Sequence, residues 1–73
     1  MSSIQKFYEF WFRPTVKDKD FAAGYIGKNG SEKVVSAVMH RDGTINLQDK
    51  PGHEVYNGDD GEEASKIVRR ILE

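Results

Sequence analysis

Few side chains in this sequence have the type and spacing that acid–base or metal chemistry requires. The two histidines, His40 and His53, match no known spacing of metal ligands, even with the acidic pair at 59–60 included. The chain has no cysteine, which excludes a disulfide scaffold, a thiolate zinc site and a cysteine nucleophile. No serine stands in the strand-to-helix turn of a nucleophile elbow. We therefore expect no enzyme active site, no metal and no cofactor.

Three glycines follow the spacing G-x-x-G-x-x-G, at Gly24, Gly27 and Gly30. A phosphate cradle made of glycines requires a turn that leads from a strand into a helix. Here the glycines fall in an expected strand and its turn. We therefore interpret Gly24 and Gly27 as positions of a bulge or of close backbone contact.

Aromatic residues are concentrated near the start of the chain, where they suit recognition better than catalysis. Five of the eight lie within six positions, at Phe7, Tyr8, Phe10, Trp11 and Phe12. In a strand, Phe7 and Trp11 would lie on the face opposite the other three. A protein of this size does not readily bury both sets. Either loops cover the second set, or that set anchors a protein partner, as Trp, Tyr and Arg do at binding hot spots.

We predict a partner-binding surface that combines aromatic, apolar and basic side chains. Its members are Phe7, Trp11, Arg13, Lys6, Met39 and Arg41. The alternative is a nucleic-acid-binding module that stacks single-stranded bases on the sheet face. That module would use Lys6, Arg13, Lys33 and Arg41.

Composition limits the function classes further. The 73 residues carry 11 Lys and Arg against 12 Asp and Glu, for a formal net charge of −1. That balance excludes both a plainly basic nucleic-acid binder and a strongly acidic DNA mimic. The length predicts a single domain over 1–73. No apolar run approaches the ~18 residues of a membrane span, and the start does not resemble a secretory signal, so we expect a cytoplasmic protein with no membrane contact.

Two dipeptides, Asn29-Gly30 and Asp42-Gly43, are typical of two-residue type I′ hairpin turns. Together they predict a three-stranded antiparallel meander over 21–48. Their registers agree on one apolar face, which we expect to be the core: Phe21, Ala23, Tyr25, Val34, Ser36, Val38, Ile45 and Leu47. The other face has a small apolar centre, which we expect to be exposed, to serve as a docking surface or to be covered by the N-terminal segment: Ile26, Val35, Ala37 and Met39.

The two ends of the chain supply the remaining elements. Apolar residues at three- and four-residue spacing predict a helix over 59–72, capped by Asp59 or Asp60 and docked on the expected core face. Residues 4–13 favour a strand that ends at Pro14 and pairs with the meander, and a short helix is the alternative. We expect loops over 14–20 and 49–58. The predicted fold class is thus α+β, with a small antiparallel sheet and one C-terminal helix.

The length, the absence of cysteine, the aromatic start and the basic face of the C-terminal helix resemble one family over the whole chain. That family comprises the small regulators that lytic bacteriophages make against host RNA polymerase. The resemblance implies a non-enzymatic transcription regulator that binds the polymerase β′ subunit near its N-terminus. Such binding would inhibit σ-dependent initiation and promote antitermination in the host cytoplasm, with nucleic acid contacted only indirectly. We expect a monomer.

Overall fold

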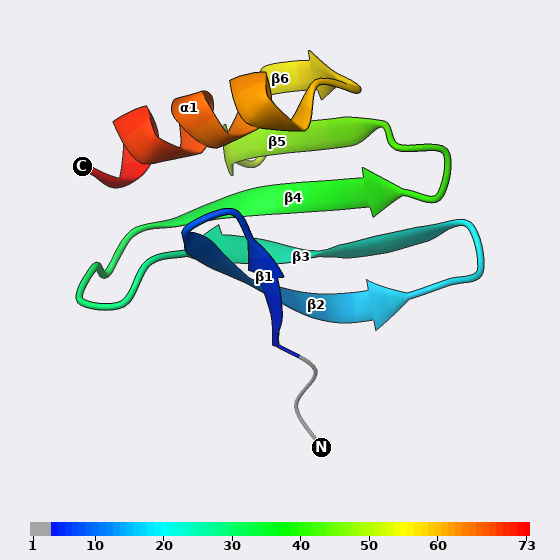
Figure 1. Cartoon of the computed structure of the whole chain (residues 1–73), viewed down its shortest axis with the longest axis horizontal. Coiled ribbons are helices and arrows are strands. Elements are labelled where there is room, and N and C mark those ends of the chain that lie inside the picture. Colours follow the sequence, from blue (N-terminus) through cyan, green and yellow to red (C-terminus); the bar gives the residue numbers. More distant parts are fainter. Residues whose placement is uncertain (1–3) are drawn as a thin grey trace.

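The computed structural model describes residues 4–73, which form one antiparallel sheet and one helix (Figure 1). The elements in chain order are β1 (Gln5–Phe7), β2 (Phe10–Lys17), β3 (Phe21–Gly27), β4 (Val34–His40), β5 (Ile45–Lys50), β6 (His53–Gly58) and α1 (Gly61–Leu72). Neighbours in sequence are neighbours in the sheet, from β1 to β6. The small α+β character is as expected, but the prediction of three or four strands is wrong, because the sheet has six. No helix within residues 4–73 is long and apolar enough to cross a membrane.

The turn between β4 and β5 differs from its prediction by one residue. Gly43 N–H donates to His40 O at 3.0 Å, and His40 N–H donates to Thr44 O at 2.8 Å, so the loop contains three residues. Gly43 has a φ of 101° while Asp42 does not have a positive φ, as a type I′ turn would require. A one-residue shift in register moves every side chain of a strand to the opposite face. Leu47 therefore pairs with Ala37.

The turn between β3 and β4 contains more residues than predicted, and the register of the two strands differs from the prediction by two residues. Gly27 pairs with Val34, and Tyr25 pairs with Ser36 rather than with Val34. A shift of two residues preserves the side on which each residue lies. The predicted grouping of Tyr25, Val34 and Ser36 on one face therefore holds, although their predicted pairing is wrong.

The core lies on the face of the sheet opposite to the predicted one, so the predicted choice of core face is wrong. We call this the inner face; its buried residues are Phe12, Ile26, Val35, Ala37, Ile45 and Leu47. Ile26, Val35 and Leu47 have no exposed surface. The opposite face, here called the outer face, carries the residues predicted to form the core, including Tyr25 and Val34, which are 45% and 42% exposed. The one-residue error at the β4–β5 turn joined Ile45 and Leu47 to the wrong set.

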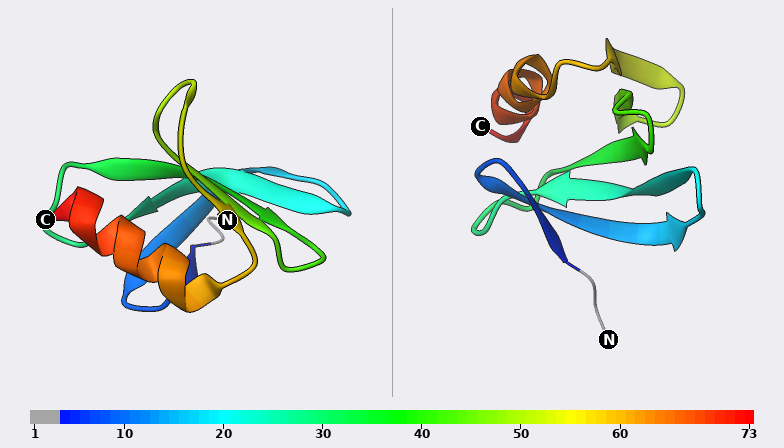
Figure 2. Two further views of the ribbon diagram at one scale, coloured as in Figure 1. Left: turned by 90° about the horizontal axis from the view of Figure 1, so that it is seen from above. Right: turned by 45° about the vertical axis from the view of Figure 1, so that its right-hand side comes forward.

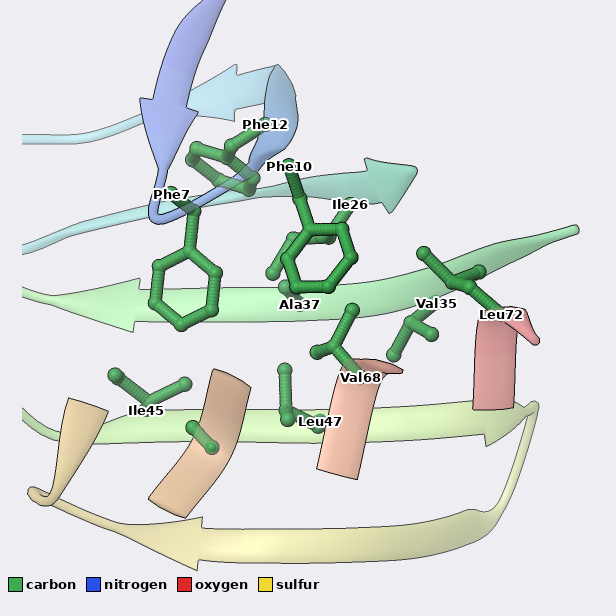
Figure 3. Packing of buried hydrophobic residues seen from close by; sticks show 11 residues of the cluster. Phe7, Phe10, Phe12, Ile26, Val35, Ala37, Ile45, Leu47, Val68 and Leu72 are labelled. Carbon is green, nitrogen blue, oxygen red and sulfur yellow. The ribbon is translucent and has the colours of Figure 1, made fainter. Parts of the chain in front are cut away.

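The aromatic segment forms a hairpin rather than one strand. β1 and β2 meet at a tight turn in which Phe7 pairs with Phe10, and Tyr8 has a φ of 57°. The turn lets Phe7, Phe10 and Phe12 all reach the core, where they are 8%, 2% and 2% exposed (Figure 3). The problem of burying both aromatic sets in one strand is thus solved by reversing the chain.

β2 continues through Pro14 to Lys17, so the prediction that Pro14 ends the element is wrong. β1 pairs with β2 only as far as Phe12, so Pro14 needs no amide hydrogen to bond a neighbour on that edge. The register with β3 shifts between Pro14 and Val16. Opposite the proline, a Cβ on Gly24 would lie 2.0 Å from Arg13 O, which confirms the interpretation of Gly24 as a close backbone contact.

The segment expected to be a loop over 49–58 contains the sixth strand. β5 extends to Lys50 and β6 begins at His53, with Gly52 at a φ of 81° in the turn between them. The bulged register between these strands obscures the alternation that a sequence pattern would show. β6 therefore carries Val55 and Tyr56 against the edge of the core.

Helix α1 begins and packs much as predicted, but on the inner face. Asp60 is the N-cap, and its Oδ1 accepts from Glu62 N–H at 3.1 Å and from Glu63 N–H at 3.2 Å. Ala64, Val68 and Leu72 are buried, and α1 packs against β4, β5 and β6 (Figure 2). An ion pair between Glu9 and Arg69 joins the turn of the aromatic hairpin to the helix. The inner face is thus covered by α1 and by the hairpin.

Candidate protein-binding surface

The outer face of the sheet is covered by no other element of residues 4–73. The helix contacts β4, β5 and β6 through residues of the core, which lies on the inner face. Figure 2 shows the helix and the aromatic hairpin on one side of the sheet. Because the outer face carries Trp11, Tyr25 and Val34, it is the part of the described surface that most needs a functional explanation.

Trp11 and Arg13 lie together on this surface, on strand β2 next to the edge strand β1. The Arg13 guanidinium carbon lies 5.1 Å from the centroid of the Trp11 ring, within the range of a cation–π contact. The indole rests on β3 at Gly27, where a Cβ would be 2.2 Å from Trp11 Cζ2. Gly27 is therefore the close contact that its place in a strand predicted, and the absent side chain makes room for the indole.

Four polar side chains form a row beside this pair, one from each of four strands. Arg13 on β2 pairs with Tyr25 on β3, Tyr25 pairs with Ser36 on β4, and Ser36 pairs with Gln48 on β5. Each alternates with a buried inner-face neighbour, so the four lie on the outer face. We call this set the outer polar row.

A groove of about 430 Å³ lies at the β5 end of the row. Its lining combines apolar and polar residues: Tyr25, Val34, Ser36, Gln48, Asp49, Lys50 and Pro51. Gln48 Oε1 accepts a hydrogen bond from Gly52 N–H at 3.2 Å, so the acceptor oxygen of this side chain already has a donor. The groove is thus lined by three residues with apolar surface, Tyr25, Val34 and Pro51, and by polar residues that include donors.

The charges at the groove are unevenly balanced. Asp49 is held by His53, whose Nδ1 lies 2.6 Å from Asp49 Oδ1, and this hydrogen bond lowers the pKa of the Asp49 carboxyl. Within residues 4–73 the ion pairs are His53–Asp49 and Glu9–Arg69. Arg13 and Lys50 therefore have no carboxylate partner of their own in that range. Asp49 is thus bound to His53, whereas Lys50, the cation that lines the groove, and Arg13, at the other end of the row, form no ion pair within residues 4–73.

The structure brings together only part of the predicted site. Trp11 and Arg13 are adjacent on the outer face, and Lys6 pairs with Trp11 on the short edge strand β1. Phe7 is in the core, where it is not available to a partner. Met39 is half-buried against the inner core. Arg41 lies in the β4–β5 turn, at the end of the strands away from Trp11.

Three further members of the surface, Tyr25, Ser36 and Gln48, were missed as site residues. The predicted register places Tyr25 and Ser36 on one face, but that face was expected to be the core. The phenol of Tyr25 and the hydroxyl of Ser36 were the available signal, because a small core is normally built from larger apolar residues.

The two histidines have different neighbours in the described part of the chain. His40 lies beside Phe21, with ring centroids 6.3 Å apart, and His53 is bound to Asp49. No group of three or more potential metal ligands converges within residues 4–73.

Comparisons with known proteins found no matching family model, and no match among curated proteins or solved structures.

Proposed function

We propose that this chain is a non-enzymatic regulator that binds a protein partner through the outer face of its sheet. The observation that carries the proposal is the pairing of Trp11 with Arg13 beside the exposed Tyr25, on a face that no other described element covers. Trp, Tyr and Arg are the side chains that most often dominate protein interfaces. A surface that holds all three in fixed positions suits that role.

The partner that we propose is the β′ subunit of bacterial RNA polymerase. This choice rests on the resemblance to small phage regulators, and it carries the corresponding activities, inhibition of σ-dependent initiation and antitermination, in the host cytoplasm. The fold supplies what such a regulator needs, which is a stable scaffold with one face left free. The nucleic-acid alternative is weaker, because Gly27 and Arg13 both cover the Trp11 ring that a base would stack on.

The test is direct binding of the full chain to purified bacterial RNA polymerase core enzyme and to isolated β′. We expect Arg13→Ala and Tyr25→Ser each to weaken binding at least about fivefold, which corresponds to about 1 kcal/mol. Arg70→Ala removes the same side chain from the exposed side of α1 and serves as the matched control, with unchanged binding. Circular dichroism establishes that each variant is folded.

Two results would contradict the proposal. One is failure of the wild-type chain to bind the polymerase or β′. The other is binding that nuclease abolishes and that falls steeply with salt, since a steep salt dependence reports phosphate contacts. A protein interface based on aromatic anchors loses little affinity between low and moderate salt.

A further inference from the structure

The chemistry of the outer polar row and its groove points to one kind of occupant. We infer that they bind an extended, acidic segment of a partner protein, with an apolar side chain seated between two carboxylates. This inference rests on the proposed function, because it names the part of the partner that the outer face recognises.

The first argument is the imbalance between donors and acceptors along the row. Arg13 contributes five N–H donors, and Tyr25 and Ser36 each contribute a hydroxyl. Gln48 contributes its NH₂ group, since its oxygen is already bonded to Gly52 N–H. The row itself contains no carboxylate, although Glu54 on β6 pairs with Gln48 and adjoins its β5 end. The guanidinium and the NH₂ group only donate, whereas the two hydroxyls can also accept, so the row favours a ligand rich in acceptors.

The second argument is charge. Arg13 stands at the β2 end of the row, and Lys50 lines the groove at the β5 end. Neither has an ion-pair partner among residues 4–73, whereas the one acid of the groove, Asp49, is bound to His53. Two cations with donors between them are complementary to two separated negative charges.

The third argument is spacing. Neighbouring strands are about 4.8 Å apart, so the row from β2 to β5 spans about 14 Å. An extended chain advances about 3.4 Å per residue and presents alternate side chains to one side. Carboxylates four residues apart would thus reach both ends of the row, while the side chain midway between them would meet Tyr25 and Val34 at the apolar wall.

A protein segment fits these features better than a nucleic acid does. The groove offers an apolar wall of Tyr25, Val34 and Pro51, and the nearest indole is covered by Gly27 and Arg13. A single strand of nucleic acid would need open ring faces at successive positions. The peptide needs only one apolar pocket between its two charges.

The experiment uses the full chain and a defined probe, an end-blocked peptide of seven residues. It has phenylalanine at its centre, aspartate two positions before and two after, and serine or threonine elsewhere. The matched peptide replaces both aspartates with lysine. Titrations followed by ¹H–¹⁵N NMR at low salt should show the acidic peptide binding at least about tenfold more tightly. The shifts should be confined to Tyr25, Ser36, Gln48 and the Trp11 indole N–H.

Variants at the two ends of the row identify the contacts. Arg13→Gln and Lys50→Gln should each weaken binding of the acidic peptide about threefold or more, while Arg70→Gln on the exposed side of α1 leaves it unchanged. NMR spectra of the free variants show whether each keeps the fold. Equal affinity for the two peptides, or shifts centred elsewhere, overturns the inference. Tighter binding of an oligothymidylate with the same number of charges overturns it in favour of nucleic acid.

The two proposals can fail separately. If polymerase binding depends on Arg13 and Tyr25 but the acidic peptide shows no preference, the outer face binds its partner by another chemistry. If the acidic peptide binds as expected but the polymerase does not, the groove is correctly described and the proposed partner is wrong.

Discussion

Trp11 and Gly27 pair across β2 and β3, and the indole occupies the space in which any other residue at position 27 would place its side chain. Arg13, two residues along β2, lies over the same ring. Glycine at position 27 therefore does more than permit close packing within the sheet. It fixes the position of the aromatic anchor on the outer face.

Replacing Gly27 with alanine should displace the indole. The new Cβ would lie 2.2 Å from Trp11 Cζ2, so the ring must move and its contact with Arg13 is lost. We expect the free energy of unfolding to fall by about 1–3 kcal/mol, as in other overpacked sites. Urea denaturation followed by fluorescence measures both effects, because Trp11 is the single tryptophan.

Gly61→Ala is the control for this change. At the start of α1 a Cβ would meet only the Tyr8 side chain, with the hydroxyl at 3.1 Å, and alanine favours the helix. Its denaturation midpoint should remain near that of the wild type. An unchanged midpoint and emission spectrum for Gly27→Ala would show that the indole does not rest on β3.

Two valines on β4 distinguish the inner face from the outer one. Val35 has no exposed surface, whereas Val38 is half-buried and lies on the outer face. Val35→Asp should abolish cooperative unfolding, because it places an unpaired charge in the core. Val38→Asp should keep a cooperative transition at a lower denaturant midpoint. Circular dichroism during urea denaturation measures both transitions. The opposite ranking would show that the core lies on the outer face.

The sequence contained enough information for the C-terminal helix and the central meander but not for the choice of face. Apolar spacing and Asp60 located the helix, because capping and amphipathic periodicity are local properties. The meander was predictable from its glycine turns. The buried face depended on whether the loop before Thr44 contained two residues or three, and the dipeptide Asp42-Gly43 occurs in both kinds of turn.

The additional strands were hidden for a different reason. Tyr8 adopts a positive φ without being glycine or asparagine, so no ordinary turn signal marks the β1–β2 hairpin. β6 is bulged against β5, which removes the alternation that identifies a strand. For the candidate site, Trp11 and Arg13 were found from residue type alone. Tyr25, Ser36 and Gln48 join them only through a register that spans four strands.

Gly43 provides a test of the three-residue turn. Its φ is 101° and no atom lies within 4 Å of an added Cβ, so a substitution there costs backbone strain without a steric clash. Gly43→Val should lower the free energy of unfolding by about 1–3 kcal/mol, because a β-branched residue resists positive φ. Gly43→Asn should cost less, because asparagine tolerates that region. Equal midpoints for the two variants in urea denaturation would show that the positive φ is not required.

The ion pair between Glu9 and Arg69 makes a contribution to stability that depends on pH. The hydrogen bond from Arg69 holds the pKa of the Glu9 carboxyl below its ordinary value of 4.5. A carboxyl whose pKa is lower in the folded state stabilises the fold fully above its unfolded pKa. That contribution is lost as the pH falls from about 4.5 through the folded pKa. Above that range the ion pair links the aromatic hairpin to α1. Below it Glu9 is protonated and the ion pair is lost.

Glu9→Gln removes the charge and keeps the size of the side chain, so it isolates this contribution. We expect the urea midpoint of the wild type to exceed that of Glu9→Gln at about pH 7, with the gap narrowing as the pH falls below about 4.5. Both side chains are exposed, so the gap is small and shrinks as salt is added. The other carboxyls with a lowered pKa, Asp42 and Asp49, are present in both proteins and cancel in the comparison. A gap that is the same at both pH values would mean that Glu9 acts through packing rather than through its charge.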